Sequence, residues 1–597
     1  MRVRFQLLLV SALVLAAYYP AIFAEFNQVD DIGMIRAIEH QDTLSLKSLF
    51  LPGYGNGLYY RPLLGLSFYL DKYFWGLNSS FMHLENILLH LLNALLVFFL
   101  SRELVARQEV GNTYIPLICA LAFGLHPVNV ESVSWVSGRT DPLALVFILT
   151  AAILLIRFRK TGSVRYVAAS ALALCCGFMS KESALGFLLG GALFIVAKVE
   201  EGGNARGNAV SKSLMVLAVA GAGVFFFFFR SSAFISNKSN IGLTLQYWEI
   251  SPLYSFMLIL RSFGFYLKKI FWPFPLNFAI VQIDPLYELM ALPLVMLCIW
   301  ILWRRSLLSA VFVAGVGLII PSFVIAFGQI AWTPFSERYV YMASAFIVTA
   351  AVHAMHQLFE RWEQQPRISP FNGILQLSVK NLSRPAPLAR WKWAFVPLFC
   401  AALVGTAQRN LAWCSNLSLY ADTVKKVPDF NEVRNMYGIA LYRSGDIAGA
   451  EREMAIARSL YSFVYDEKFD LNYASVLREQ KRYQECLEVL QKVVKKTKGK
   501  SILAYEELIH VHQGRLVECP PSQRQAVVAS IMDASDRLYA LEPSAEVHYM
   551  LGKIALSLQE SGRALKYFAK ASEKFEQGSP YKAFAIKLMK RAKISNV

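Results

Sequence analysis

Long apolar runs are the feature that most constrains what this chain can fold into. Hydrophobic residues make up 55% of it and charged residues only 17%, whereas soluble domains carry about a quarter charged residues. As a helix, a run of about 20 apolar residues crosses the roughly 30 Å hydrocarbon core of a bilayer. About eleven spans are predicted: 5–24, 84–101, 114–126, 142–157, 165–179, 184–198, 212–229, 288–303, 307–328, 339–357 and 393–408. A wholly soluble protein is therefore excluded.

The first apolar run follows Arg2 and Arg4, so its N-terminus is expected in the cytoplasm. A cleaved signal peptide is the alternative, with Ala24 at the end of a cleavage site. Because the run is longer than the apolar region of a typical signal peptide, we interpret it as a signal anchor.

The basic residues predict which loops face which side. They cluster between apolar runs, most heavily in the loop 358–392, and the positive-inside rule makes those loops cytoplasmic. The loops 25–83, 127–141, 180–183, 230–287 and 329–338 are then outside, together with the tail. The segment 253–275 is apolar enough to add a crossing and move the tail to the cytoplasm. Its Arg261, Lys268, Lys269 and Pro273 favour an interfacial or re-entrant helix instead.

Two other classes of site are not expected. The formal charge of +18 comes from short basic clusters and forms no continuous stripe, so nucleic acid is not a predicted partner. The 8 cysteines are scattered without metal-ligand spacing, which predicts neither a disulfide framework nor a zinc site.

After Arg409 the apolar runs give way to helices with small residues at tetratricopeptide-repeat spacing. Three units show this spacing: Gly438, Ala450, Met454 and Ala457; Ala474, Cys486, Leu490 and Val493; and Gly552, Ala564, Phe568 and Ala571. A degenerate unit lies near 504–540. The predicted fold is all-α, with a polytopic membrane helix bundle at 1–410 and a tetratricopeptide-repeat α-solenoid at 411–597. Such a tail binds partners and catalyses nothing by itself.

Two adjacent carboxylates, Asp30 and Asp31, follow the first predicted span on its outer side. Near a low-dielectric boundary and beside a like charge, one carboxylate has a raised pKa and can act as a general base. The alternative is that Asp30 caps a helix over 32–40 and that both acids favour the helix dipole.

A second polar group shares one face of a predicted helix at the bilayer edge. His83, Asn86 and His90 stand at i, i+3 and i+7, an expensive set to place there without a purpose. Three interpretations compete: a metal pair without a third ligand at known spacing, a buried hydrogen-bonded network between helices, and a polar substrate site.

Ionisable residues also gather in the other expected outer loops. Pro127 and Gly138 break the helices on either side of one loop, which should bring together near the outer interface His126, Glu131, Arg139 and Asp141. Later outer turns between apolar spans hold Lys181, Glu182, Glu337 and Arg338. Each can form an ion pair that joins helices, but together they predict an outward-facing polar cavity.

Eight ordered motifs carry a family resemblance: VDD, YYRPL, FMHLENILLH, LAFGLHPVNVESV, SGRTD, SKES, SERYVY and AQRNLAWCSNLSLYADTVKKVP. In this order the chain resembles, over nearly its whole length, the transmembrane and tetratricopeptide-repeat glycosyltransferases, relatives of the protein O-mannosyltransferases in the GT-C superfamily. The His-Pro and Arg-Pro-Leu blocks are the most specific. The chain departs from the animal members in its shorter tail and atypical middle repeat, so its substrate need not be theirs.

The resemblance implies inverting transfer of a mannose-like sugar from a polyprenyl phosphate to an acceptor hydroxyl at the outer or luminal face. Asp30 and Asp31 match the family's acidic motif, in which one carboxylate takes the proton from that hydroxyl. The leaving lipid phosphate needs fixed cations. The candidates for binding donor phosphate and sugar are Arg61, His83, His90, His126, Arg139, Asp141, Lys181 and Arg338. Beyond the lipid-linked donor, no cofactor or divalent metal is expected.

Other functions stay compatible with the sequence. A transferase that modifies surface glycans shares the chemistry, and a non-catalytic scaffold or a transporter also fits, since buried ionisable residues mark transport pathways too. The repeats are expected to select an acceptor protein or glycan. The short tail and Arg-rich loops favour a bacterial inner membrane with a periplasmic tail over an endoplasmic reticulum membrane with a luminal tail.

Overall fold

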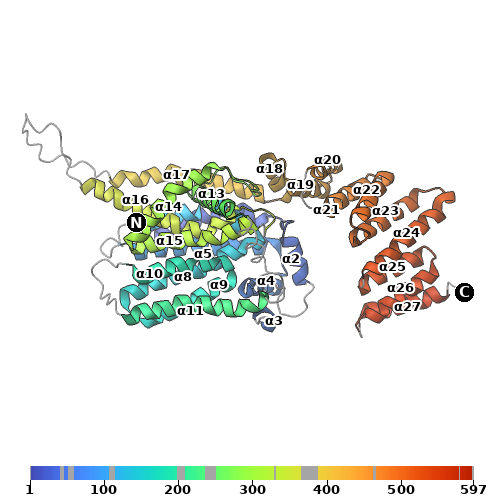
Figure 1. Cartoon of the computed structure of the whole chain (residues 1–597), viewed down its shortest axis with the longest axis horizontal. Coiled ribbons are helices and arrows are strands. Elements are labelled where there is room, and N and C mark those ends of the chain that lie inside the picture. The colour runs from blue at the N-terminus through green and yellow to red at the C-terminus, as the bar shows by residue number, and fades with distance from the viewer. Residues whose placement is uncertain are drawn as a thin grey trace, which may run out of the picture. The chain divides into compact units, whose positions relative to one another are not determined.

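The computed structural model describes residues 2–39, 46–50, 60–105, 114–197, 209–234, 251–328, 331–364, 388–460, 466–542, 544–576 and 579–594 (Figure 1). These residues are helical and contain no β-strand beyond one isolated bridge. The chain divides into two compact units, Met1–Val427 and Pro428–Val597, which we call the membrane unit and the repeat unit.

Helices cover every predicted span. They are α1 (Val3–Tyr18) with η1 (Tyr19–Phe23), α5 (Ser79–Leu104), α6 (Ile115–Gly124), α8 (Thr140–Thr161), α9 (Val164–Ser180), α10 (Phe187–Val196), α11 (Ala209–Phe234), α14 (Leu286–Arg304), α15 (Leu307–Gly328), α16 (Tyr341–Gln364) and α17 (Leu388–Trp413). The hydropathy of the sequence therefore predicts the helical bundle, because length and apolar composition are local properties.

Seven helices in the described ranges are individually long and apolar enough to cross a membrane. They are Val3–Phe23, Ser79–Leu104, Val136–Thr161, Val210–Arg230, Leu286–Arg304, Leu307–Ala326 and Glu337–Trp362. Ile115–Gly124 and Pro127–Ser134 form an eighth candidate, bent by 45°. The helices Val164–Ser180 and Glu182–Val196 are apolar but shorter. The predicted count of eleven thus includes helices that are broken or short, as well as α17, which carries Arg409 and Asn410 near its end.

Short helices gather at one end of the bundle (Figure 1). They include α2 (Asp31–Glu39), α3 (Leu46–Phe50) and α4 (Pro62–Trp75). Four further breaks interrupt the long helices: η2 with α7 (Pro127–Asn129 and Val130–Ser134), η3 (Val136–Arg139), η4 (Glu182–Gly186) and η5 (Glu337–Val340). Broken backbone is tolerated at membrane depth only where other groups satisfy it, so these turns bring polar side chains together.

Helix α13 (Pro252–Phe271) occupies most of the disputed segment 253–275. Its first turns are mostly exposed, as at Tyr254 and Phe256, whereas its second half is mostly buried, as at Tyr266 and Ile270. It is not one of the seven apolar helices given above.

Helix α14 is the least covered of the apolar helices. Only 6% of its most apolar stretch is buried, compared with 61% for Leu307–Ala326. Its exposed side chains are large and apolar, among them Met296 and Trp303. In a membrane such a surface faces lipid, because lipid tails are as apolar as these side chains.

The repeat unit consists of helices paired along the chain. They are α19 (Asn431–Ser444), α20 (Ile447–Ser459), α21 (Glu467–Glu479), α22 (Tyr483–Lys496), α23 (Ile502–Glu518), α24 (Pro521–Leu541), α25 (Ala545–Ser557), α26 (Ser561–Lys574) and α27 (Pro580–Ile594). Small residues stand where the helices of a pair meet. A Cβ added at Gly438 would lie 2.6 Å from Cγ of Met454, and one at Gly552 would lie 2.7 Å from the Phe568 ring. The repeat spacing therefore predicts the helix pairs correctly.

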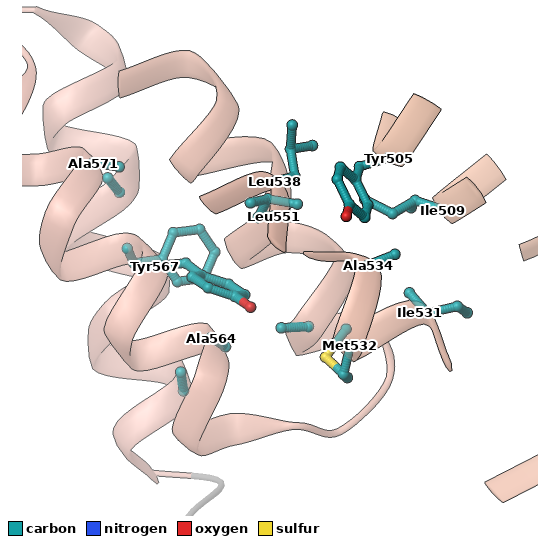
Figure 2. Close-up of a cluster of buried hydrophobic side chains, with 14 of the residues drawn as sticks. Tyr505, Ile509, Ile531, Met532, Ala534, Leu538, Leu551, Ala564, Tyr567 and Ala571 are labelled. Atoms are coloured by element: carbon teal, nitrogen blue, oxygen red, sulfur yellow. The ribbon is translucent and has the colours of Figure 1, made fainter. Parts of the chain in front are cut away.

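The degenerate unit near 504–540 is also a helix pair, α23 and α24. Figure 2 shows part of the core around it, in which side chains of this pair meet side chains of α25 and α26. Tyr505 and Ile509 come from α23, Ile531 and Leu538 from α24, and Leu551, Ala564 and Tyr567 from α25 and α26. The degenerate unit and the last repeat thus share one hydrophobic core.

In the sequence, the boundary between the two units lies after Val427, later than the predicted one after residue 410. Helix α18 (Asn416–Lys426) belongs to the membrane unit. Asn416 donates to the Glu25 carboxylate at 3.0 Å and to the Phe26 carbonyl at 2.9 Å, and it accepts from the Gln28 amide at 3.1 Å. This helix is therefore tied to the segment that carries the acidic pair.

Candidate active site

The two adjacent carboxylates have different surroundings. Asp31 is the first residue of α2 and is fully buried. Its Oδ1 accepts from the Ser137 amide at 2.9 Å and the Ser137 hydroxyl at 2.5 Å, and its Oδ2 accepts from the Asn27 amide at 2.9 Å. Asp30 precedes the helix and is exposed, while its backbone carbonyl accepts from the Met34 amide at 3.0 Å. Asp31 thus holds structure together, and Asp30 is the carboxylate that outside groups can reach.

Two arginines act electrostatically on the carboxylate of Asp30. Partial burial raises the pKa of its carboxyl group, and the guanidinium groups of Arg338 and Arg61 act in the opposite direction. Burial also raises the pKa of Asp31, to about 6, although its hydrogen bonds from Ser137 and Asn27 oppose the rise. An exposed carboxylate with a raised pKa, flanked by positive charge, is suited to accept a proton near neutrality.

Two arginines share a single carboxylate next to this acid. Arg61, the residue before α4, places Nε 2.8 Å from Glu182 Oε2, and Arg230 near the end of α11 places Nη1 3.1 Å from Glu182 Oε1. All three side chains are mostly buried, with 16 to 23% exposed. One carboxylate cannot neutralise two guanidinium groups, so the trio carries a net positive charge.

Arg338 in η5 is fixed from two directions. Its guanidinium lies 4.5 Å from the centre of the Trp135 ring, and Nη1 is 3.6 Å from Glu131 Oε1. Glu131 also accepts from the Ser336 hydroxyl at 2.5 Å and from the backbone amides of Glu337 and Arg338 at 3.1 and 3.3 Å. Such a cation is preorganised, because its backbone and its side chain are both held.

Lys181 completes the cluster. It follows α9, and its Nζ lies 2.7 Å from Oδ1 of Asp141 in the first turn of α8. Arg61 and Arg338 are near enough to act electrostatically on its ammonium group. We call Arg61, Lys181, Arg230 and Arg338 the cation cluster.

Arg139 does not join the cation cluster. Its Nη1 lies 2.6 Å from Asp71 and 3.1 Å from Glu85, its Nε donates to Asn86 Oδ1 at 2.7 Å, and its Nη2 donates to the Met82 carbonyl at 3.0 Å. The side chain is only 1% exposed. Because protein groups accept from all three of its nitrogens, Arg139 joins α4 to α5.

Two of the candidate histidines belong to buried networks between helices. His90 contacts the Tyr341 hydroxyl through Nδ1 at 2.8 Å and the Gly124 carbonyl through Nε2 at 3.0 Å. His126 contacts the Ile270 carbonyl through Nε2 at 2.8 Å. A carbonyl only accepts, so Nε2 carries the proton in each ring. The arrangement matches the network interpretation of the polar face on α5.

His83 is fully buried against the backbone at Ala24 and Glu25. It is therefore not exposed beside the acidic pair. In the part of the chain that the structure describes, no group of three or more His, Cys, Asp or Glu side chains is arranged to hold a metal ion.

Sequence reasoning missed Arg230, which was assigned to the start of a loop. A signal was present, because Arg230 follows the apolar run Phe225–Phe229 at the predicted outer side, much as Lys181 and Arg338 flank the spans 165–179 and 339–357. It also missed that Glu182 bridges two arginines, which no local pattern reveals.

No protein-family model matches the chain. Its curated relatives include mouse TMTC1, 36% identical over 92 residues, which are 15% of this chain and 9% of that protein. Human TMTC2 is 31% identical over 203 residues, 31% of this chain and 23% of the relative. Mouse TMTC3 is 28% identical over 157 residues, 24% and 16% of the two chains. The matched segments thus span less than a quarter of each of these relatives.

Solved structures resemble the chain only distantly. The Cut9–Hcn1 hetero-tetramer of the APC/C matches with a TM-score of 0.23 and 12% identity, over 89% of this chain and 93% of that one. Yeast Tom70 matches with a TM-score of 0.17 and 13% identity, over 81% and 93%. The long apolar helices and the curated relatives together identify an integral multi-pass membrane protein. Over the matched segments, the chain is a homologue of the protein O-mannosyl-transferases TMTC1, TMTC2 and TMTC3.

Proposed function

We propose that this chain is a membrane glycosyltransferase that moves a mannose-like sugar from a polyprenyl phosphate to an acceptor hydroxyl, on a protein in the first instance. The observation that carries the proposal is the exposed carboxylate of Asp30, on which Arg61 and Arg338 of the cation cluster act electrostatically. A base and fixed cations are the two things that displacement of a lipid phosphate by a hydroxyl requires. The names of the curated relatives support the same reaction class.

In this proposal Asp30 is the general base. It takes the proton of the acceptor hydroxyl while the hydroxyl oxygen bonds to the anomeric carbon. The bond between that carbon and the phosphate oxygen breaks, and the lipid phosphate leaves with the electron pair. A single displacement of this kind inverts the anomeric carbon. Asp31 acts indirectly, by holding the start of α2 against Ser137.

The cation cluster receives the charge of the leaving phosphate. Arg61 and Arg230 keep a net positive charge after pairing with Glu182, and their planar N–H groups suit a phosphate. Arg338 is preorganised over Trp135, so it stabilises negative charge with little reorganisation. These protein cations perform the role that a divalent metal has in other phosphate chemistry, so we expect transfer to continue in a chelator.

The repeat unit would select the acceptor, since stacked helix pairs offer an extended binding surface. The basic loops favour a site and a tail on the outer face. We place the protein in a bacterial inner membrane with the repeats in the periplasm.

The test is transfer of labelled sugar from a synthetic polyprenyl phosphate by the purified protein in lipid vesicles, with protein and glycan acceptors compared. We expect Asp30→Asn to abolish transfer and Asp30→Glu to retain part of it. Undiminished transfer by Asp30→Asn would overturn the base assignment. Failure of the wild type with every lipid-linked sugar and acceptor would overturn the reaction, and transfer to glycans alone would replace the protein acceptor.

A further inference from the structure

Glu337, the residue before Arg338, is the point where η5 is fastened to two other parts of the membrane unit. It is 1% exposed. Its Oε1 accepts from Lys269 Nζ at 2.7 Å and from the Asn277 amide at 2.9 Å, and its Oε2 lies 3.9 Å from Arg409. These partners come from α13, the segment after it, and α17.

On α13, Lys269 is the residue that binds Glu337. Its side chain is 3% exposed. Besides Glu337, its Nζ donates to the carbonyls of Pro273, at 3.0 Å, and Pro275. One ammonium group therefore ties the end of α13, the turn that follows it, and the carboxylate next to Arg338.

Stability alone is a poor explanation of this pair. Removing two charges from water costs several kcal/mol per ion, and a buried ion pair is often no more stable than well-packed apolar side chains. Glu131 holds the same turn through the backbone amides of Glu337 and Arg338. The short turn is thus held by Glu131 through its backbone and by Lys269 through the side chain of Glu337.

We propose that Glu337 and Lys269 are positioning residues that hold the Arg338 guanidinium where it meets the phosphate of the lipid donor, an inference that rests on the proposed function. Neither side chain needs to touch the donor. Loss of the pair lets η5 rotate, and the guanidinium then leaves its place 4.5 Å from the Trp135 ring.

The experiment measures binding of farnesyl phosphate to the full-length protein in lipid nanodiscs. Four forms are compared: wild type, Glu337→Gln, Arg338→Gln and the double variant. Each single substitution should weaken binding by about tenfold, the effect of one charge-assisted hydrogen bond. If Glu337 acts through Arg338, the double variant binds no more weakly than Arg338→Gln alone. A double variant that loses the product of the two single effects overturns the proposal.

A matched control lies on the same helix. Arg261 of α13 pairs with Glu288 of α14, and its Nε lies 2.7 Å from Glu288 Oε1. Glu288→Gln removes an acid partner of α13 without touching η5, so it should bind farnesyl phosphate as the wild type does. Equal weakening by Glu288→Gln would show that any broken pair on α13 suffices, which contradicts a specific role for Glu337.

A second variant covers the case in which Glu337→Gln does not fold. Glu337→Asp keeps the charge but withdraws it from Lys269 by one methylene, and it should weaken binding in the same direction, with only folded protein compared. If wild type binds and Glu337→Asp binds equally well, the positioning role is wrong. If wild type itself does not bind farnesyl phosphate, the fault lies with the proposed function instead.

Discussion

Asp30 and Asp31 are adjacent in the chain, yet Asp30 is exposed and Asp31 is fully buried against Ser137. The start of α2 produces this difference, because Asp30 precedes the helix, whereas Asp31 is its first residue and accepts from Ser137 and Asn27. Two carboxylates that look equivalent in the sequence therefore have separate duties, and substitutions should separate them.

Asp30→Asn is expected to remove transfer without unfolding the protein. The side chain is exposed, so its loss should change stability by no more than about 0.5 kcal/mol. Labelled-sugar transfer checks the loss of activity, and the thermal unfolding temperature of the same preparation checks that stability is unchanged. A large drop in unfolding temperature would mean that the carboxylate is structural after all.

Asp31→Asn is expected to do the reverse. The carboxylate accepts from two backbone amides and one hydroxyl, and an amide group would turn its own N–H₂ toward one of these donors. A loss of about 1–3 kcal/mol should follow. Ser137→Ala removes only the hydroxyl and should cost less. Equal stability of wild type and Asp31→Asn at pH 7.5 would refute this account.

Arg61→Gln should weaken farnesyl phosphate binding by about ten- to a hundredfold, since a hydrogen bond to a charged group contributes about 1.5–3 kcal/mol. Arg61→Lys should restore only part of the loss, because an ammonium lacks the planar fork of a guanidinium. Arg157, which pairs with Glu103 on α5, supplies the control. Arg157→Gln should bind like the wild type, and a similar loss there would indicate a general charge effect.

Gly552→Ala should destabilise the repeat unit by about 1–3 kcal/mol, because the new methyl group would lie 2.7 Å from the Phe568 ring. Gly562→Ala is the matched control, since no atom lies within 4 Å of a Cβ at that position. Hydrogen exchange in peptides from α25 and α26 measures the difference. Equal exchange in the two variants would show that this helix pair is not closely packed.

The repeat unit should lose stability in acid through His548. This residue is 2% exposed beside Tyr539, and burial lowers its pKa below the roughly 6.5 of an unfolded chain. The unfolded state therefore binds more protons, so stability falls as pH drops below about 6.5. Calorimetry should show this in the transition that Gly552→Ala shifts, and His548→Phe should reduce the slope. An unchanged slope in that variant would contradict the assignment.

The helices were predictable because their signals are local. Each apolar run that hydropathy predicts as a span lies on a helix of the structure. Small residues such as Gly552 mark the helix pairs of the repeat unit. The end of the membrane unit was not predictable, because α18 is tied down by Asn416 contacting Glu25, a residue 391 positions earlier.

The candidate site residues came from two kinds of signal. Ionisable residues in the loops between apolar runs predict an outer polar cavity, whereas the roles proposed for Asp30, Arg61 and Arg338 come from the resemblance carried by VDD, YYRPL and SERYVY. The acid with which each cation forms an ion pair depends on tertiary packing. Arg139 and Arg338 each precede an apolar run in the sequence. Packing nevertheless pairs Arg139 with Asp71 on α4, 68 residues away, and Arg338 with Glu131.

The exposed α14 has a consequence for how this protein should be prepared. With 6% of its apolar stretch buried, it depends on surrounding lipid for most of its contacts, and through Glu288 and Arg261 it is joined to α13. Helices with few protein contacts open at the lowest free energy. A detergent that strips annular lipid would thus leave this helix with less support than the other helices of the membrane unit. The choice of solubilising agent then acts on this enzyme candidate as a mutation would.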